Sequence, residues 1–105
     1  MLSKLGQIST LKRVYLSFYA LTGTMPTQIG SLSLIIDLSL HTNKLFGTVP
    51  SKIGGMSTLE SLQLHSNALT GTVPTQLGSL SLLEIELEDN KLTGTVPAKI
   101  GETRL

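Results

Sequence analysis

The sequence predicts an α/β solenoid whose repeats each contribute one short strand to a parallel sheet. The tetrapeptide Gly-Thr-(Met/Val)-Pro occurs four times, starting at Gly23, Gly47, Gly71 and Gly94, so the period is 24, 24 and then 23 residues. A period of about 20 to 50 residues is typical of solenoids, in which each repeat is buried only by its neighbours. An alternation of the type Leu-x-Leu precedes each tetrapeptide, and a Pro-x-x-(Ile/Leu)-Gly segment begins at its proline.

The repeats superpose on one another along nearly the whole chain. In the third repeat the shared positions are Leu59, Leu62, Leu64, Asn67, Leu69, Gly71, Val73 and Pro74. We expect one domain over residues 1–105, with repeats at 5–26, 27–50, 51–74 and 75–97 and a partial repeat at 98–105. Both ends of such a stack expose apolar surface unless they are capped, and no segment has the composition of a polar cap. We therefore expect the chain to be a fragment of a longer array.

Each repeat is expected to contain a strand, because its apolar residues alternate at period 2. The strands are expected near residues 13–17, 37–41, 61–65 and 84–88. Since the strand recurs in every turn of the solenoid, the strands stack parallel, about 4.8 Å apart. The apolar side chains then point into the core, and the intervening side chains face outward on the concave surface.

An asparagine follows the strand in the last three repeats, at Asn43, Asn67 and Asn90. An amide both donates and accepts hydrogen bonds, so we expect this asparagine ladder to satisfy buried backbone groups of the turn. Tyr19 stands at the same position in the first repeat and cannot do so, and we expect a looser first turn there. The glycine and proline that follow permit a tight backbone path and fix φ where the convex side begins.

The repeat resembles the plant-specific class of leucine-rich repeats, whose signature is LxxLxLxxNxLxGxIP, and the resemblance covers residues 5 to 101. It implies a right-handed superhelix, or horseshoe, with a short parallel β-sheet on the concave face. It also implies a second short strand at the Gly-Thr stretch and 3₁₀ or short helical turns on the convex side. Apolar residues such as Ile53 and Met56 are expected to close the core there.

Composition argues against nucleic acid and membrane as partners of this segment. Charged residues make up 14% of the chain and the net charge is +1, which is no electrostatic signature of nucleic acid or anionic lipid. There is no cysteine, which excludes thiolate metal sites and disulfides in this stretch. The most apolar window, residues 32–40, is far shorter than the roughly 20 apolar residues that span a bilayer.

The outward positions of the strands form columns across the concave face. The columns are Arg13, Asp37, Ser61, Glu84; Tyr15, Ser39, Gln63, Glu86; Ser17, His41, His65, Glu88; and Phe18, Thr42, Ser66, Asp89. This pattern predicts a binding face with a basic aromatic end and an acidic end, although outward positions of any soluble sheet must be polar. The candidate ligand-binding residues are Arg13, Tyr15, Phe18, Asp37, His41, Gln63, His65, Glu84, Glu86 and Glu88.

Two histidines in one column raise the question of metal binding. His41, His65 and Glu88 are neighbours that could chelate zinc, or the two rings could form a pH-sensitive pair with lowered pKa values. A flat row of strands offers poor tetrahedral geometry, so we expect no metal and no cofactor. We also expect no enzyme activity, because no nucleophile elbow or Ser-His-Asp pattern is present. Glu84, Glu86 and Glu88 alternate on one strand like the carboxylate pair of a glycoside hydrolase, but an open strand offers them no enclosing pocket.

A second regular surface consists of Thr-x-Thr pairs on the Gly-Thr stretches. The pairs are Thr22 and Thr24, Thr70 and Thr72, and Thr93 and Thr95, with Phe46 and Thr48 interrupting the row. Evenly spaced threonine ladders resemble the surfaces of ice-binding solenoids, although threonine also suits any short exposed strand. A stand-alone structural or ice-binding solenoid is therefore the alternative function.

The family resemblance implies non-enzymatic recognition of a protein or peptide through the concave face. It implies the ectodomain of a receptor-like kinase or receptor-like protein, or a solenoid like the polygalacturonase inhibitors. The implied partners are a protein or peptide ligand and a co-receptor. The implied location, for a longer protein that contains this segment, is the extracellular face of the plasma membrane or the secreted space.

Overall fold

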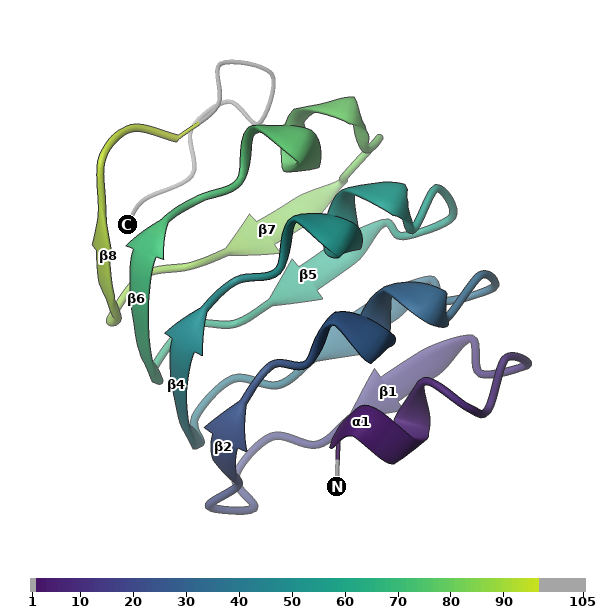
Figure 1. The fold of residues 1–105 in the computed structure, drawn as a ribbon, viewed down its shortest axis with the longest axis horizontal. Coiled ribbons are helices and arrows are strands. Elements are labelled where there is room, and N and C mark those ends of the chain that lie inside the picture. The colour runs from purple at the N-terminus through teal and green to yellow at the C-terminus, as the bar shows by residue number, and fades with distance from the viewer. Residues whose placement is uncertain (1, 97–105) are drawn as a thin grey trace.

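The computed structural model describes residues 2–96, which form a stack of coils (Figure 1). A short helix, α1 (Leu2–Leu5), comes first. Each coil after it contributes one strand to a first sheet and one strand to a second sheet, usually followed by a 3₁₀ turn. In chain order these elements are β1 (Arg13–Tyr15), β2 (Thr22–Thr24), η1 (Thr27–Ser31), β3 (Asp37–Ser39), β4 (Lys44–Thr48), η2 (Ser51–Gly55), β5 (Ser61–Gln63), β6 (Ala68–Thr72), η3 (Thr75–Ser79), β7 (Glu84–Glu86) and β8 (Lys91–Thr93).

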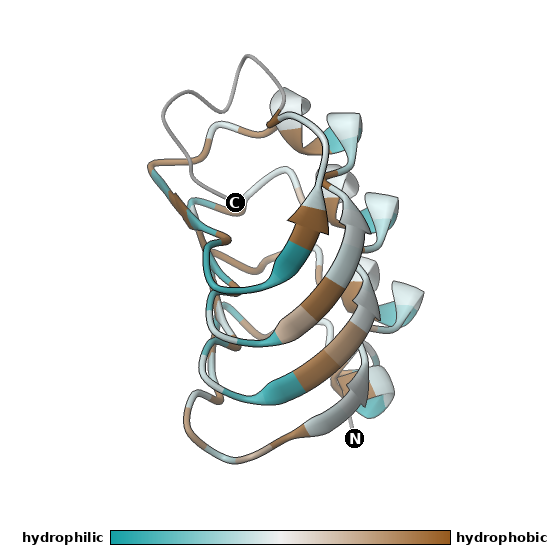
Figure 2. Ribbon diagram, turned by 90° about the vertical axis from the view of Figure 1, so that its left-hand side faces the viewer, coloured by the Kyte–Doolittle hydropathy of each residue, from teal (hydrophilic) through white to brown (hydrophobic). Residues whose placement is uncertain are grey.

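Two parallel sheets run along the stack. The first has the order β1-β3-β5-β7 and the second the order β2-β4-β6-β8. In Figure 2 the second sheet faces the viewer and the 3₁₀ turns lie along one side of it. The parallel first sheet, the second short strand of each repeat and the 3₁₀ turns after the prolines are all confirmed. The fold is therefore a right-handed repeat solenoid with its sheet on the concave side.

The strands of the first sheet end about two positions earlier than the sequence predicted. A left-handed residue turns each chain out of the sheet three positions after the strand end, at Phe18 (φ 65), Thr42 (φ 57), Ser66 (φ 59) and Asp89 (φ 56). Backbone pairing nevertheless continues past the strand ends, because the N–H of Leu64 donates to the carbonyl of Glu86 at 2.9 Å. The outward columns therefore stay side by side beyond the strands themselves.

The core lies between the two sheets and the 3₁₀ turns. Leu62 and Leu64 on the first-sheet side, Leu69 of β6, Ile53 of η2 and the nearby Met56 are all fully buried. The prediction that the last two close the core from the convex side is confirmed. Burying each such side chain contributes about 1.5–3 kcal/mol, so these layers supply most of the favourable free energy of the fold.

Successive 3₁₀ turns approach one another closely at a glycine. A Cβ atom on Gly54 would lie 2.6 Å from the backbone oxygen of Gln76 in the next coil, a distance that real Cβ atoms do not adopt. Gly6 meets the backbone of Gln28 in the same way, and α1 packs against η1. Residues 2–6 therefore occupy the place of a convex turn, which the sequence did not indicate because a leucine replaces the proline.

The asparagine ladder makes the hydrogen bonds that its position predicted. The carbonyl oxygen of the Asn67 amide accepts a hydrogen bond from the N–H of Leu45 at 3.0 Å, in the preceding coil. Its amide nitrogen donates to the carbonyl oxygens of Leu40 (3.1 Å), Leu64 (3.1 Å) and His65 (3.3 Å). One side chain thus connects the backbones of two coils.

The first turn, which lacks the asparagine, receives its hydrogen bonds from the next coil. The side-chain oxygen of Asn43 accepts from the N–H groups of Tyr19 (3.1 Å) and Leu21 (3.0 Å). The backbone there differs from the other turns, because both Phe18 and Ala20 have positive φ. That this turn is looser stays a prediction.

Two further predictions from the sequence concern membrane spans and the C-terminal residues. Among residues 2–96, no helix has the length and apolar character needed to cross a bilayer. The convex turn expected at residues 97–101 and the partial repeat at 98–105 lie outside the described residues.

Candidate binding face on the first sheet

The register of the first sheet aligns the outward side chains into the expected columns. The first column runs across neighbouring strands from Arg13 through Asp37 and Ser61 to Glu84. The second column is aligned in the same way, from Tyr15 through Ser39 and Gln63 to Glu86. Side chains of one column are therefore next-strand neighbours that a single ligand can contact together.

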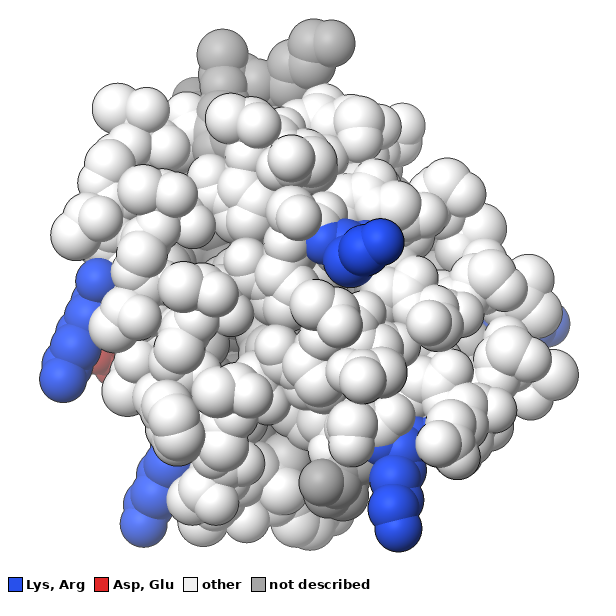
Figure 3. Space-filling view, in the orientation of Figure 1, with Lys and Arg blue, Asp and Glu red and all other residues white. Residues whose placement is uncertain are grey.

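Charge is distributed unequally between the two sides of the solenoid. Figure 3 shows the side that carries the 3₁₀ turns, where basic side chains stand apart from one another and hardly any acidic surface is visible. The acidic side chains within residues 2–96 belong to the strands of the first sheet or to positions beside them. The candidate face is thus the acidic side of the molecule.

Arg13, at the expected basic end of this face, is paired with a neighbouring carboxylate. Nε of Arg13 lies 3.1 Å from Oδ2 of Asp37, and the hydroxyl of Tyr15 donates to the same oxygen at 3.0 Å. The hydrogen bond to this carboxylate, together with partial desolvation and its negative charge, raises the pKa of Tyr15. The charge of Arg13 is therefore partly compensated within the sheet, whereas Lys12 beside it is exposed.

Three exposed aromatic side chains mark the aromatic end. The exposed fractions are 62% for Tyr15, 75% for Phe18 and 68% for Tyr19. Sequence reasoning singled out the first two but treated Tyr19 only as a lost asparagine. The sequence does indicate that Tyr19 is exposed, because a large aromatic side chain in place of a half-buried amide cannot enter the same turn and must point outward.

The middle of the face is a stack of rings. The rings of His41 and His65 are parallel within 10°, with centroids 4.3 Å apart, and Phe18 meets His41 edge-on at 5.4 Å. Nδ1 of His41 lies 2.8 Å from the hydroxyl of Thr42. Burial and then the neighbouring His65 lower the pKa of His41, and the charge of Glu86 partly opposes them. This direction agrees with the one considered for His41 in a stacked histidine pair.

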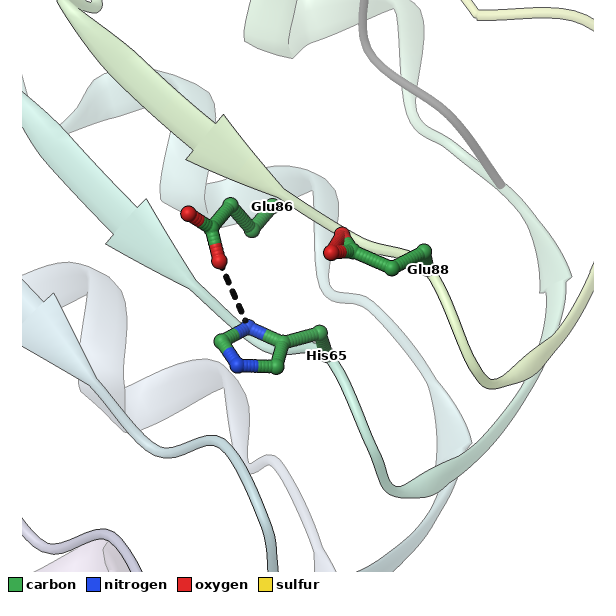
Figure 4. Close-up of side chains that lie close together, drawn as sticks. All are labelled: His65, Glu86 and Glu88. Atoms are coloured by element: carbon green, nitrogen blue, oxygen red, sulfur yellow. Dashed lines mark ion pairs between the residues drawn. The ribbon is translucent and has the colours of Figure 1, made fainter.

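The acidic end contains both satisfied and less satisfied carboxylates. Glu84 accepts hydrogen bonds from the hydroxyl of Ser61 at 3.1 Å and from the side-chain amide of Gln63 at 2.6 Å. Glu86 and Glu88 instead lie beside His65, as Figure 4 shows. The ligand atoms of these three side chains all lie within 4.8 Å of one another.

The second sheet presents the threonine surface. Thr48 lies opposite Thr70, and Thr72 lies opposite Thr93, and all four side chains are exposed. Phe46 of β4 is 51% exposed and interrupts the surface, as the sequence suggested.

Comparison with known proteins identifies the repeat. The model of the family "Leucine Rich Repeat" matches residues 58–80. A search of curated proteins gives no match.

Solved structures match the chain over most of its length. The leucine-rich repeat ectodomain of the receptor kinase GASSHO1/SCHENGEN3 from Arabidopsis thaliana, in complex with CASPARIAN STRIP INTEGRITY FACTOR 2, is 35% identical with a TM-score of 0.90, over 94% of this chain and 12% of that one. The ectodomain of the Arabidopsis receptor kinase HAESA, in complex with an IDA peptide hormone, is 31% identical with a TM-score of 0.86, and the match covers 93% of this chain and 17% of that one. A plant ice-binding protein is 33% identical with a TM-score of 0.85, and the match covers 92% of this chain and 32% of that one.

The fold, the repeat signature and these matches define the chain as a leucine-rich repeat solenoid. More narrowly, its repeats are of the plant-specific type and are similar to those of the receptor kinase ectodomains described above. The chain spans less than a third of the length of each of these three solved structures.

Proposed function

We propose that the chain is a non-enzymatic recognition module that binds an extended peptide or a protein surface along the first sheet. The observation that carries this proposal is an open face of aligned columns that grades from exposed aromatic side chains to carboxylates. The peptide hormone in the similar HAESA ectodomain structure and the partner in the GASSHO1/SCHENGEN3 ectodomain structure support it. Both proteins are receptor kinases, and GASSHO1/SCHENGEN3 is a membrane receptor kinase, which supports an extracellular location and a role in signalling for a longer protein that contains this segment.

The size of the sheet sets what the segment can recognise. Four strands about 4.8 Å apart span about 14 Å, the length of about four extended peptide residues. The chemistry of the face favours a ligand with an apolar or aromatic side chain at the end near Tyr15 and Phe18 and a basic side chain near Glu88. A longer ligand, or a co-receptor that contacts both ligand and solenoid, would need neighbouring coils or a second protein.

A random-peptide display selection on the immobilised chain, in buffer with a chelator, tests this proposal. Selected peptides are expected to lose about tenfold or more in affinity with Tyr15→Ala or Phe18→Ala, because exposed aromatic side chains dominate such interfaces. Charge reversal of Glu86 and Glu88 should abolish their binding. Thr70→Tyr on the second sheet is the matched control and should leave it intact. Peptides that are insensitive to all the first-sheet changes would contradict the proposal.

A second candidate function is ice binding by the second sheet. The similarity to a plant ice-binding protein and the exposed threonine pairs favour it. Inhibition of ice recrystallisation in frozen sucrose provides the assay, and Thr72→Tyr should remove the activity while the first-sheet variants retain it. Phe46→Thr should strengthen the activity, because it removes the bulky side chain that interrupts the surface.

A further inference from the structure

His65, Glu86 and Glu88 form a compact group of metal-ligating side chains between two neighbouring coils. His65 lies just beyond β5, Glu86 is the last residue of β7, and Glu88 follows two residues later with its side chain on the same face. The imidazole nitrogen and the carboxylate oxygens all lie within 4.8 Å of one another. The backbone bond from Leu64 to Glu86 fixes this part of the register.

The Nδ1 atom of His65 lacks a hydrogen-bond partner. Among the side-chain nitrogen and oxygen atoms of residues 2–96, it is the one that is shielded from solvent and still makes no hydrogen bond of good geometry. Oε2 of Glu86 lies 3.1 Å from it, which is an ion-pair contact only when the ring is protonated. In a neutral ring, Nδ1 carries either a lone pair, which the carboxylate repels, or a proton that is poorly directed for a hydrogen bond. A cation bound by both Nδ1 and Oε2 would remove the repulsion between the lone pair and the carboxylate.

Ring stacking holds Nδ1 in this direction. The parallel ring of His41, 4.3 Å away, covers one face of the His65 ring and limits its rotation. Only 20% of the His65 side chain is exposed, compared with 38% for Glu86. The nitrogen is therefore already oriented, and the flexible carboxylates can adjust around it.

We propose that His65, Glu86 and Glu88 bind a zinc ion on the concave face. Zinc bonds to imidazole nitrogen and carboxylate oxygen are about 2.0–2.2 Å long, so two ligand atoms of a tetrahedral site lie about 3.3 Å apart. The 3.1 Å between Nδ1 and Oε2 is close to that separation without any rearrangement. Rotation of Glu88 brings the third ligand within reach, and the fourth position stays open to water or to a donor atom of a bound partner.

The site differs from the one considered for the sequence, which combined the two histidines with Glu88. Stacked rings cannot direct their nitrogen lone pairs at one ion, because the lone pairs lie in parallel ring planes. Glu86, from the neighbouring column, takes the place of His41 as a ligand. The ligands therefore do not lie in one flat row, and the objection to tetrahedral geometry applies to the histidine pair but not to this group.

The choice of ion follows from the nitrogen ligand. Carboxylates alone suit magnesium and calcium, whereas an imidazole favours zinc and its transition-metal neighbours. The proposal does not depend on peptide binding, and zinc alone is the probe. A basic side chain of a peptide is the competing occupant of the same carboxylates.

The test is a calorimetric zinc titration of the 105-residue chain in a buffer that does not bind metals. One zinc per chain is expected, with no comparable binding of magnesium. His65→Phe keeps the ring stack but removes the nitrogen, and Glu86→Gln and Glu88→Gln remove one charge each. Each should weaken zinc binding about tenfold or more. In nuclear magnetic resonance spectra of the unsubstituted chain, zinc should shift the ring signals of His65.

Two control variants separate this site from diffuse attraction of cations. Glu60→Gln removes one exposed carboxylate outside the group, and His41→Phe keeps a stacking ring without a nitrogen. Both should retain zinc affinity within about twofold, with circular dichroism confirming that every variant is folded. The proposal is overturned by an absence of saturable binding up to about 1 mM zinc, by equal binding of magnesium, or by unchanged affinity in His65→Phe. It is also overturned if Glu60→Gln loses as much affinity as Glu88→Gln.

Discussion

Removal of the Asn67 side chain is expected to destabilise the stack more than any surface change nearby. The amide group carries two protons, so its three donor contacts share two hydrogen bonds, and its oxygen accepts a third from Leu45. Each bond contributes about 1 kcal/mol net, which gives an upper value of about 3 kcal/mol. Because the side chain is half-buried and water can replace part of this bonding, Asn67→Ala should cost about 2–3 kcal/mol.

Urea denaturation followed by circular dichroism measures this loss. Asn67→Asp keeps an acceptor but turns a charged oxygen toward the three carbonyl groups that the amide nitrogen contacts, so it should cost at least as much stability as Asn67→Ala. Thr70→Ala, on the exposed side of β6, is the control and should change stability by less than about 0.5 kcal/mol. Equal stability of Asn67→Ala and Thr70→Ala would refute the idea that the amide connects the coils.

Three further predictions concern packing and titration. Gly54→Ala places a methyl group against the next coil and should destabilise the chain by about 2 kcal/mol or more, whereas Gly55→Ala, with nothing within 4 Å, should be close to neutral in thermal unfolding. The lowered pKa of His41 means that the unfolded chain binds more protons than the folded one between the two pKa values. Stability in chelator-containing buffer should therefore fall as pH is lowered from about 7 through the folded pKa, and His41→Phe should reduce this slope in urea midpoints. Asp37→Asn should lower the pKa of Tyr15 toward its ordinary value, which ultraviolet absorbance titration detects; an unchanged tyrosine titration would exclude this carboxylate as the cause.

The backbone fold could be predicted from the sequence because several independent features of the repeat predict the same coil. The period, the buried alternation of Leu62 and Leu64 and the amide of Asn67 each predict the same coil, and a shift of register would bury polar side chains. The convex turn at residues 2–6 was missed because its proline is replaced, although Gly6 retains the close contact that defines the turn.

Side-chain pairing on the exposed face was predicted less well. The columns are correct, but the ion pair of Arg13 with Asp37 and the contact of His65 with Glu86 depend on rotamers of long side chains. Such choices differ by fractions of a kcal/mol, and periodicity does not encode them. The contact of His65 also crosses from one column to the next, which an argument made column by column cannot detect.

The glycine contact between 3₁₀ turns has a consequence for the shape of a longer array. In a bent stack, the radius depends on how much farther apart the coils are on the outer side than on the inner side. Hydrogen bonds hold the inner spacing near 4.8 Å, so only the outer spacing can vary. Glycine at positions such as Gly54 keeps that outer spacing small and the arc wide. A bulkier residue there in successive coils would bend the array more tightly and narrow the space available to a partner on its inner side.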